Sequence, residues 1–123
     1  MNVGDALLLE GKAAAALARY QTSLEEESRL LGAALAWHAL GQASEAQAAL
    51  DELVRKYGAG RPYDVAQAYA FRGERDRAFE WLERALAQRD VGLRELKLTR
   101  FLRPLHDDPR FTALLKKMNL PLD

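Results

Sequence analysis

Few side chains in this sequence are spaced for catalysis or for metal binding. The two histidines, His38 and His106, lie far apart along the chain, and the sequence contains no cysteine that could share a metal ion with either of them. A protein zinc site takes three or four nitrogen, sulfur or carboxylate ligands. Neither histidine is spaced from a serine as the base of a nucleophilic pair would be, and no glycine-rich phosphate loop is present. We therefore expect no metal, no cofactor and no enzymatic activity.

Two charged clusters could bind a partner of opposite charge. Arg94, Lys97, Arg100 and Arg103 recur every three residues, which on a helix makes a slanting basic stripe that could hold a carboxylate or a phosphate. Glu25–Glu27 form an acidic run that could receive a basic peptide. Each cluster also has an ordinary explanation. The basic stripe could be a solvated helix face, and the acidic run could mark the start of a helix, where carboxylates are favoured.

The overall charge balance argues against nucleic acid or a membrane surface as the partner. Lysine plus arginine and aspartate plus glutamate each number 18, so no net field attracts a polyanion. Residues 1–60 hold five basic and eight acidic side chains, whereas residues 61–123 hold thirteen and ten. This asymmetry could align head-to-tail contacts, or it could be ordinary surface chemistry.

We expect the protein to be cytoplasmic. The lack of cysteine fits a reducing compartment. No stretch approaches the roughly 18 consecutive apolar residues of a membrane span, and the first residues lack the basic flank and cleavage pattern of a signal peptide.

The elements that position these residues are expected to be helices throughout. Alanine, leucine, glutamate, glutamine and arginine fill the periodic stretches, isoleucine is absent, and valine and threonine are few. Gly11, Gly41 and Gly73 each end an apolar-periodic run, where a residue without Cβ can take the left-handed backbone that closes a helix. Asp108 followed by Pro109 signals a helix start, because the carboxylate caps free N–H groups and proline needs no donor there. We predict helices at residues 3–10, 12–25, 27–40, 43–57, 62–72, 75–88, 91–99 and 108–118.

One residue spacing occurs three times along the chain. A glycine is followed five residues later by an alanine and then, at helical intervals, by a large side chain and a small or apolar one. The glycines are 30 and 32 residues apart, and self-similarity at this period indicates stacked helical hairpins that cannot bury their apolar faces alone. The three copies are Gly11, Ala16, Tyr20 and Ser23; Gly41, Ala46, Leu50 and Leu53; and Gly73, Ala78, Leu82 and Ala85.

These positions resemble the tetratricopeptide repeat, a unit of about 34 residues that pairs two antiparallel helices. The third copy matches best, the second is fair, and the first lacks the start of its opening helix. Residues 66–121 also resemble the closing segment of repeat regions in multidomain bacterial signalling proteins. The matching positions are Leu30, Ala33, Ala34, Trp37, Ala46, Leu50 and Leu53 in the second copy, and Pro62, Val65, Ala66, Tyr69, Ala78, Leu82 and Ala85 in the third.

The resemblance implies one all-α domain over residues 1–123, in which stacked antiparallel hairpins form a right-handed superhelix. The repeat units would be residues 1–26, 27–58 and 59–90, and residues 91–123 would form a closing segment that caps the last hairpin. The loop at residues 57–62 would be a joint between repeats rather than a domain linker. The chain would be either a free-standing adaptor or a fragment of a larger regulator.

In relatives of this kind, one face of each opening helix lines a concave groove that binds a protein or peptide. Apolar residues on that face would be covered by a ligand, by another part of the chain or by a second copy. We expect a non-catalytic protein-interaction module, and the alternative is a self-association module of a signalling protein in which a homodimer covers this face. The expected partner-binding residues are Ser28, Leu31, Leu35 and His38 from one unit and Tyr63, Gln67 and Phe71 from the next, together with Arg94 and Lys97 of the basic stripe.

Overall fold

The computed structural model describes residues 2–118, and this part of the chain is all-helical, without a strand. It divides into two compact units, Met1–Gly58 and Ala59–Asp123. The division falls at the boundary expected between the second and third repeats.

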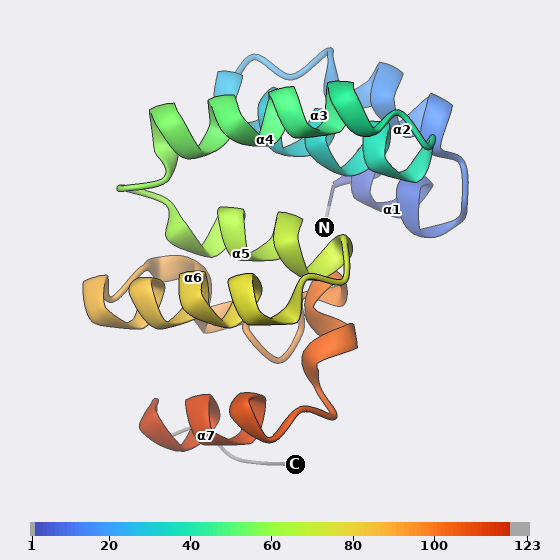
Figure 1. Cartoon of the computed structure of the whole chain (residues 1–123). Helices are drawn as coiled ribbons and strands as arrows, with labels where there is room; N and C mark the ends of the chain where they lie inside the picture. Colours follow the sequence, from blue (N-terminus) through green and yellow to red (C-terminus); the bar gives the residue numbers. More distant parts are fainter. Residues whose placement is uncertain (1, 119–123) are drawn as a thin grey trace. The chain divides into compact units, whose positions relative to one another are not determined.

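The first unit consists of the helices α1 (Val3–Leu9), α2 (Ala13–Tyr20), α3 (Glu26–Ala39) and α4 (Ala43–Tyr57). Helix α1 packs against α2, and both contact α3. Helices α3 and α4 lie side by side as a hairpin (Figure 1).

The second unit consists of the α-helices α5 (Pro62–Phe71), α6 (Arg75–Gln88) and α7 (Pro109–Lys117) and the 3-10 helices η1 (Val91–Glu95) and η2 (Arg100–Leu105). Helices α5 and α6 form a hairpin (Figure 1), η1 and η2 fold back onto α5, and α7 contacts α6.

Three helices end in the same left-handed turn, as predicted. The φ angles of Gly11, Gly41 and Gly73 are 82°, 79° and 79°. In each turn the glycine N–H donates to the carbonyl three residues back, and the next N–H donates to the carbonyl five residues back, over 2.9 to 3.1 Å. A Cβ added at any of these glycines would meet no atom within 4 Å, so the backbone angle is what favours glycine there.

The alanine of each sequence copy lies in the core of its unit. Ala16, Ala46 and Ala78 are 0%, 2% and 0% exposed. The large side chain that follows each alanine is buried too; these are Tyr20, Leu50 and Leu82. The repeated spacing therefore marks buried positions at which a second helix approaches closely.

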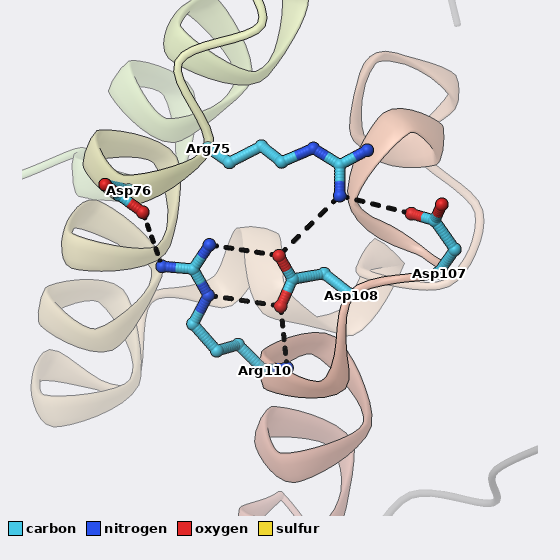
Figure 2. Close-up of polar contacts among 5 residues, drawn as sticks. All are labelled: Arg75, Asp76, Asp107, Asp108 and Arg110. Atoms are coloured by element: carbon cyan, nitrogen blue, oxygen red, sulfur yellow. Dashed lines mark hydrogen bonds and ion pairs between the residues drawn. The ribbon is translucent and has the colours of Figure 1, made fainter.

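The start of α7 is fixed by an ion-pair network, shown in Figure 2. Asp108 caps the helix by accepting the backbone N–H of Arg110 over 2.9 Å, and it also pairs with the Arg110 guanidinium. Arg110 reaches Asp76 of α6 over 2.8 Å, while Arg75 lies 3.3 Å from Asp107 and 3.6 Å from Asp108. The hydrogen bonds from the Arg110 guanidinium and backbone N–H, with a smaller contribution from the charge of Arg75, lower the pKa of Asp108 to about 2. The helix start predicted at Asp108 is confirmed.

Two of the predicted helices differ from those observed. The helix expected over residues 12–25 ends at Tyr20, because the Thr22 hydroxyl donates to the carbonyl of Arg19 over 2.7 Å and the chain turns there. The helix expected over residues 91–99 is the short η1, and the sequence did not indicate η2 at all. The Thr99 hydroxyl donates to the carbonyl of Glu95 over 3.0 Å and closes a turn between the two 3-10 helices.

Candidate functional site

Asp90 sets the position of η1 against α5. Its Oδ1 accepts the Gly92 N–H over 2.8 Å, and its Oδ2 accepts the Tyr63 N–H over 3.1 Å. One carboxylate therefore satisfies free N–H groups at the starts of two helices.

Tyr63 is the buried side chain at this junction. A Cβ added at Gly92 would lie 2.6 Å from Cδ2 of the Tyr63 ring, so η1 approaches the ring only because residue 92 is glycine. The Tyr63 and Thr99 hydroxyls are hydrogen-bonded to each other over 2.7 Å. Burial raises the pKa of Tyr63 to about 12. Tyr63 is therefore a neutral, structural phenol rather than a proton carrier near neutral pH.

A pocket of about 360 Å³ opens between α5 and η1. It brings together the predicted partner-binding residues Tyr63, Gln67 and Arg94, whereas Phe71 and Lys97 lie outside its lining. Phe71 packs edge-on against Phe101, with 5.5 Å between the ring centroids. The lining is Arg61, Tyr63, Asp64, Gln67, Asp90, Val91, Gly92, Arg94, Glu95 and Thr99.

Two apolar side chains that the sequence did not single out are exposed in the segment Val91–Thr99, part of which lines this pocket. Val91 lines the pocket and is 65% exposed, and Leu98, next to the pocket residue Thr99, is 78% exposed. Arg94 and Arg100 are exposed in the same segment. We call the exposed residues Val91, Arg94, Leu98 and Arg100 the η1–η2 surface.

The basic stripe predicted from the sequence is divided between two short helices. Arg94 belongs to η1, Lys97 to the turn that follows, and Arg100 and Arg103 to η2. Leu93 and Leu96 are buried and Leu98 is exposed. A regular helix over residues 91–99 would also place Leu98 on the side opposite Leu93 and Leu96. The predicted start at residue 91 agrees with η1, whose first turn is capped by the Asp90 side chain, but the predicted end at residue 99 is wrong, because η1 ends at Glu95.

The other predicted partner-binding residues belong to the first unit. Ser28 lines a separate pocket of about 390 Å³ next to Tyr20 and Arg19. Leu31 is half-buried, His38 is exposed, and Leu35 is only 1% exposed, which leaves it little surface for a ligand.

The histidines do not gather with other metal ligands in the described part of the chain. Within residues 2–118, no three His, Asp or Glu side chains are grouped as a metal ion would need. His106 stacks on Phe111 with 4.4 Å between the ring centroids, and burial, with a smaller contribution from Arg103, lowers its pKa.

Comparison of the chain with known protein families, curated proteins and solved structures identified no relative. No protein-family model, no curated protein and no solved structure matches the chain. In the described range, none of the helices has the length and apolar character needed to span a membrane.

Proposed function

We propose that this chain is a non-catalytic, tetratricopeptide-like helical repeat protein that binds protein segments, and that the η1–η2 surface is part of its docking site. The observation that carries the proposal is the exposure of Leu98 and Val91 in a segment that lines a polar pocket and that also exposes Arg94 and Arg100. The thrice-repeated glycine turn and the buried alanines support the repeat assignment. The right-handed superhelix, the cytoplasmic location and the link to bacterial signalling proteins are parts of the same proposal.

The charge of the surface selects the kind of partner. Residues 91–103 hold four basic side chains and one acidic one, Glu95. A segment with acidic side chains around an apolar one would complement both the arginines and Leu98. Burying Leu98 against such a segment would stabilise the complex by about 1.5 kcal/mol or more.

A binding measurement with a defined peptide tests the proposal. The probe is a short fluorescent peptide in which glutamates flank a central leucine, and the readout is anisotropy on titration with the full chain. Leu98→Ser and Arg94→Glu should each weaken binding about tenfold, which corresponds to about 1.4 kcal/mol. The matched control is Lys116→Glu, which makes the same charge change at an exposed residue of α7 in the same unit.

Two outcomes would contradict the assignment. If Arg94→Glu and Lys116→Glu bind the peptide equally, the effect is one of net charge and not of this surface. If the peptide with glutamine in place of glutamate binds as tightly, the arginines do not select the partner. The role predicted for Ser28, Leu31 and His38 stays a prediction.

A further inference from the structure

We propose that the occupant of the η1–η2 surface is the loop around Leu24 of a second copy of this chain, so that copies associate head to tail. The inference rests on the proposed function, because it names the protein segment that the docking surface receives.

The segment Gln21–Glu25, which we call the Leu24 loop, presents an isolated apolar side chain next to acidic residues. Leu24 is 97% exposed, the highest value among the large hydrophobic residues of the described range. Glu25 follows it and is exposed as well, and Glu26 and Glu27 start α3. The loop thus offers an apolar side chain and a carboxylate, which could complement Leu98 and the arginines of the η1–η2 surface.

Hydrogen bonds hold the Leu24 loop in one conformation from both sides. Before Leu24, the Ser23 N–H donates to the carbonyl of Tyr20 over 3.0 Å. After it, the Glu25 N–H donates to the Ser23 hydroxyl over 3.3 Å, and Arg29 of α3 donates to the Ser23 carbonyl over 2.6 Å. A side chain presented by a fixed loop loses less conformational entropy on binding than one on a mobile segment.

Leu98 is held in a similar way on the second unit, in a segment whose charged residues are mostly basic. The N–H groups of Leu98 and Thr99 both donate to the carbonyl of Glu95, over 2.8 and 2.9 Å, and this fixes the turn that exposes Leu98. Arg94 and Arg100 lie on either side of this turn in the chain. In each unit the most exposed leucine of the described residues is therefore held by hydrogen bonds. The exposed charged residue next in the chain is Glu25 on the first unit, while Arg94 and Arg100 outnumber Glu95 on the second.

The charges of whole units follow the same division. Residues 1–58 hold five basic and eight acidic side chains, and residues 59–123 hold thirteen and ten. Opposite net charges favour the approach of the first unit of one copy to the second unit of another. Because the two surfaces differ, the contact is heterologous, and it propagates until a ring closes or a chain of copies forms.

The experiment mixes two variants of the full chain, each with one surface altered. The loop variant carries Leu24→Ser and Glu25→Lys, and the turn variant carries Leu98→Ser, Arg94→Glu and Arg100→Glu. Glu26 is left unchanged because it bonds to Lys56 and Tyr57 within its own unit. Sedimentation equilibrium at high micromolar concentration gives the molar mass, and circular dichroism checks that each variant is folded.

We expect wild type to form oligomers and each variant alone to remain monomeric. An equimolar mixture should form a one-to-one dimer and nothing larger, since the loop variant keeps an intact η1–η2 surface and the turn variant keeps an intact Leu24 loop. High salt should dissociate the dimer, because the screening length falls from about 10 Å at 0.1 M to about 3 Å at 1 M.

Several results would overturn the inference. These are a wild type that stays monomeric, a single variant that still oligomerises, and a mixture that remains monomeric. If the glutamate-leucine peptide binds while wild type stays monomeric, the proposed function stands and only the identity of the partner is wrong. If the peptide does not bind, the proposed function fails whatever the molar mass.

Discussion

Each unit contains a buried tyrosine that packs against glycine, Tyr20 in the first and Tyr63 in the second, but these two tyrosines are held differently. Tyr20 ends α2 and lies against two glycines, Gly4 of α1 and Gly32 of α3. Tyr63, in the first turn of α5, lies against one, Gly92 of η1. Added Cβ atoms at these glycines would come within 2.1 to 2.7 Å of the nearest ring atom.

The hydroxyl groups differ as well. Tyr20 donates to the Asp5 carboxylate over 2.6 Å, whereas Tyr63 is hydrogen-bonded to the neutral hydroxyl of Thr99. Burial is the main cause that raises both pKa values, and for Tyr20 the carboxylate raises it further. Both units therefore pack a tyrosine ring against glycine, but the tyrosine hydroxyl bonds to a charged carboxylate in the first unit and to a neutral hydroxyl in the second.

Replacing the glycines is expected to have the largest effect on this comparison. The Cβ of Gly32→Ala would lie 2.1 Å from Cγ of Tyr20, close to the backbone, where the ring cannot swing away. We expect Gly32→Ala to lower the free energy of unfolding by about 3 kcal/mol and Gly92→Ala by about 2 kcal/mol. Each unit has one tryptophan, so urea unfolding followed by the fluorescence of Trp37 or Trp81, with the other changed to phenylalanine, reports the units separately.

Gly60→Ala is the matched control, since a Cβ there meets no atom within 4 Å and the backbone is not left-handed. It should unfold like the parent chain. A Gly32→Ala variant as stable as Gly60→Ala would show that Tyr20 is not confined by α3.

Removing the tyrosine hydroxyls should distinguish the bond to the charged carboxylate from the bond to the neutral hydroxyl. Tyr20→Phe takes a donor away from a carboxylate, and we expect a loss of about 2 kcal/mol, because hydrogen bonds to charged groups contribute about 1.5 to 3 kcal/mol. Tyr63→Phe breaks a bond between two neutral groups and should cost about 1 kcal/mol. Equal losses from the two variants in the same urea experiment would mean that the charge of Asp5 is irrelevant.

The sequence predicts those features of the fold that a few neighbouring residues determine, and it does not predict those that depend on how separate helices pack together. The turns at Gly11, Gly41 and Gly73 and the start at Asp108 depend on a few adjacent residues, and the sequence predicted them. The seating of Tyr20 on Gly32 depends on how α2 and α3 meet, so no local pattern could reveal it.

The candidate site shows the same limit. Tyr63, Gln67 and Arg94 were expected to share a site and do line one pocket. Leu98 was not predicted to be a site residue, although helical periodicity places it opposite the buried Leu93 and Leu96. The break between η1 and η2 could not be predicted, because it depends on how both short helices pack against α5. Leu35 was expected at a binding surface, and its burial reflects packing that helical periodicity alone does not specify.

Alkaline pH gives a further way to compare the tyrosines. A phenol whose pKa is raised by folding contributes stability that is present below the unfolded value, about 10, and that is lost as the pH rises toward the folded value. For Tyr63 this window runs from about 10 to about 12. At about pH 11 the loss from this residue should be about 1 kcal/mol.

The measurement is the melting temperature of wild type, Tyr63→Phe and Tyr20→Phe between neutral and alkaline pH. Each variant should lose less stability than wild type on the alkaline side, since it lacks one group that ionises on unfolding. A Tyr63→Phe variant whose alkaline destabilisation equals that of wild type would show that the Tyr63 phenol ionises in the folded chain as readily as in the unfolded one.

The smallest effect concerns how the helices of the two units end. The second unit closes α5 with Gly73 but closes α6 with Arg89, a non-glycine residue at φ 55° with the same pair of backbone bonds. Left-handed backbone costs a residue with Cβ about 1 kcal/mol, so Arg89→Gly should stabilise the second unit by about 0.5 kcal/mol, the remainder being lost to the greater freedom of glycine in the unfolded chain. Gly73→Ala and Gly41→Ala should each destabilise their own unit by about 1 kcal/mol. Urea unfolding followed through Trp81 and Trp37 measures the gain from Arg89→Gly and the losses from the two glycine variants. If Arg89→Gly is less stable than wild type, the contacts of the arginine side chain stabilise the second unit by more than the left-handed backbone angle destabilises it.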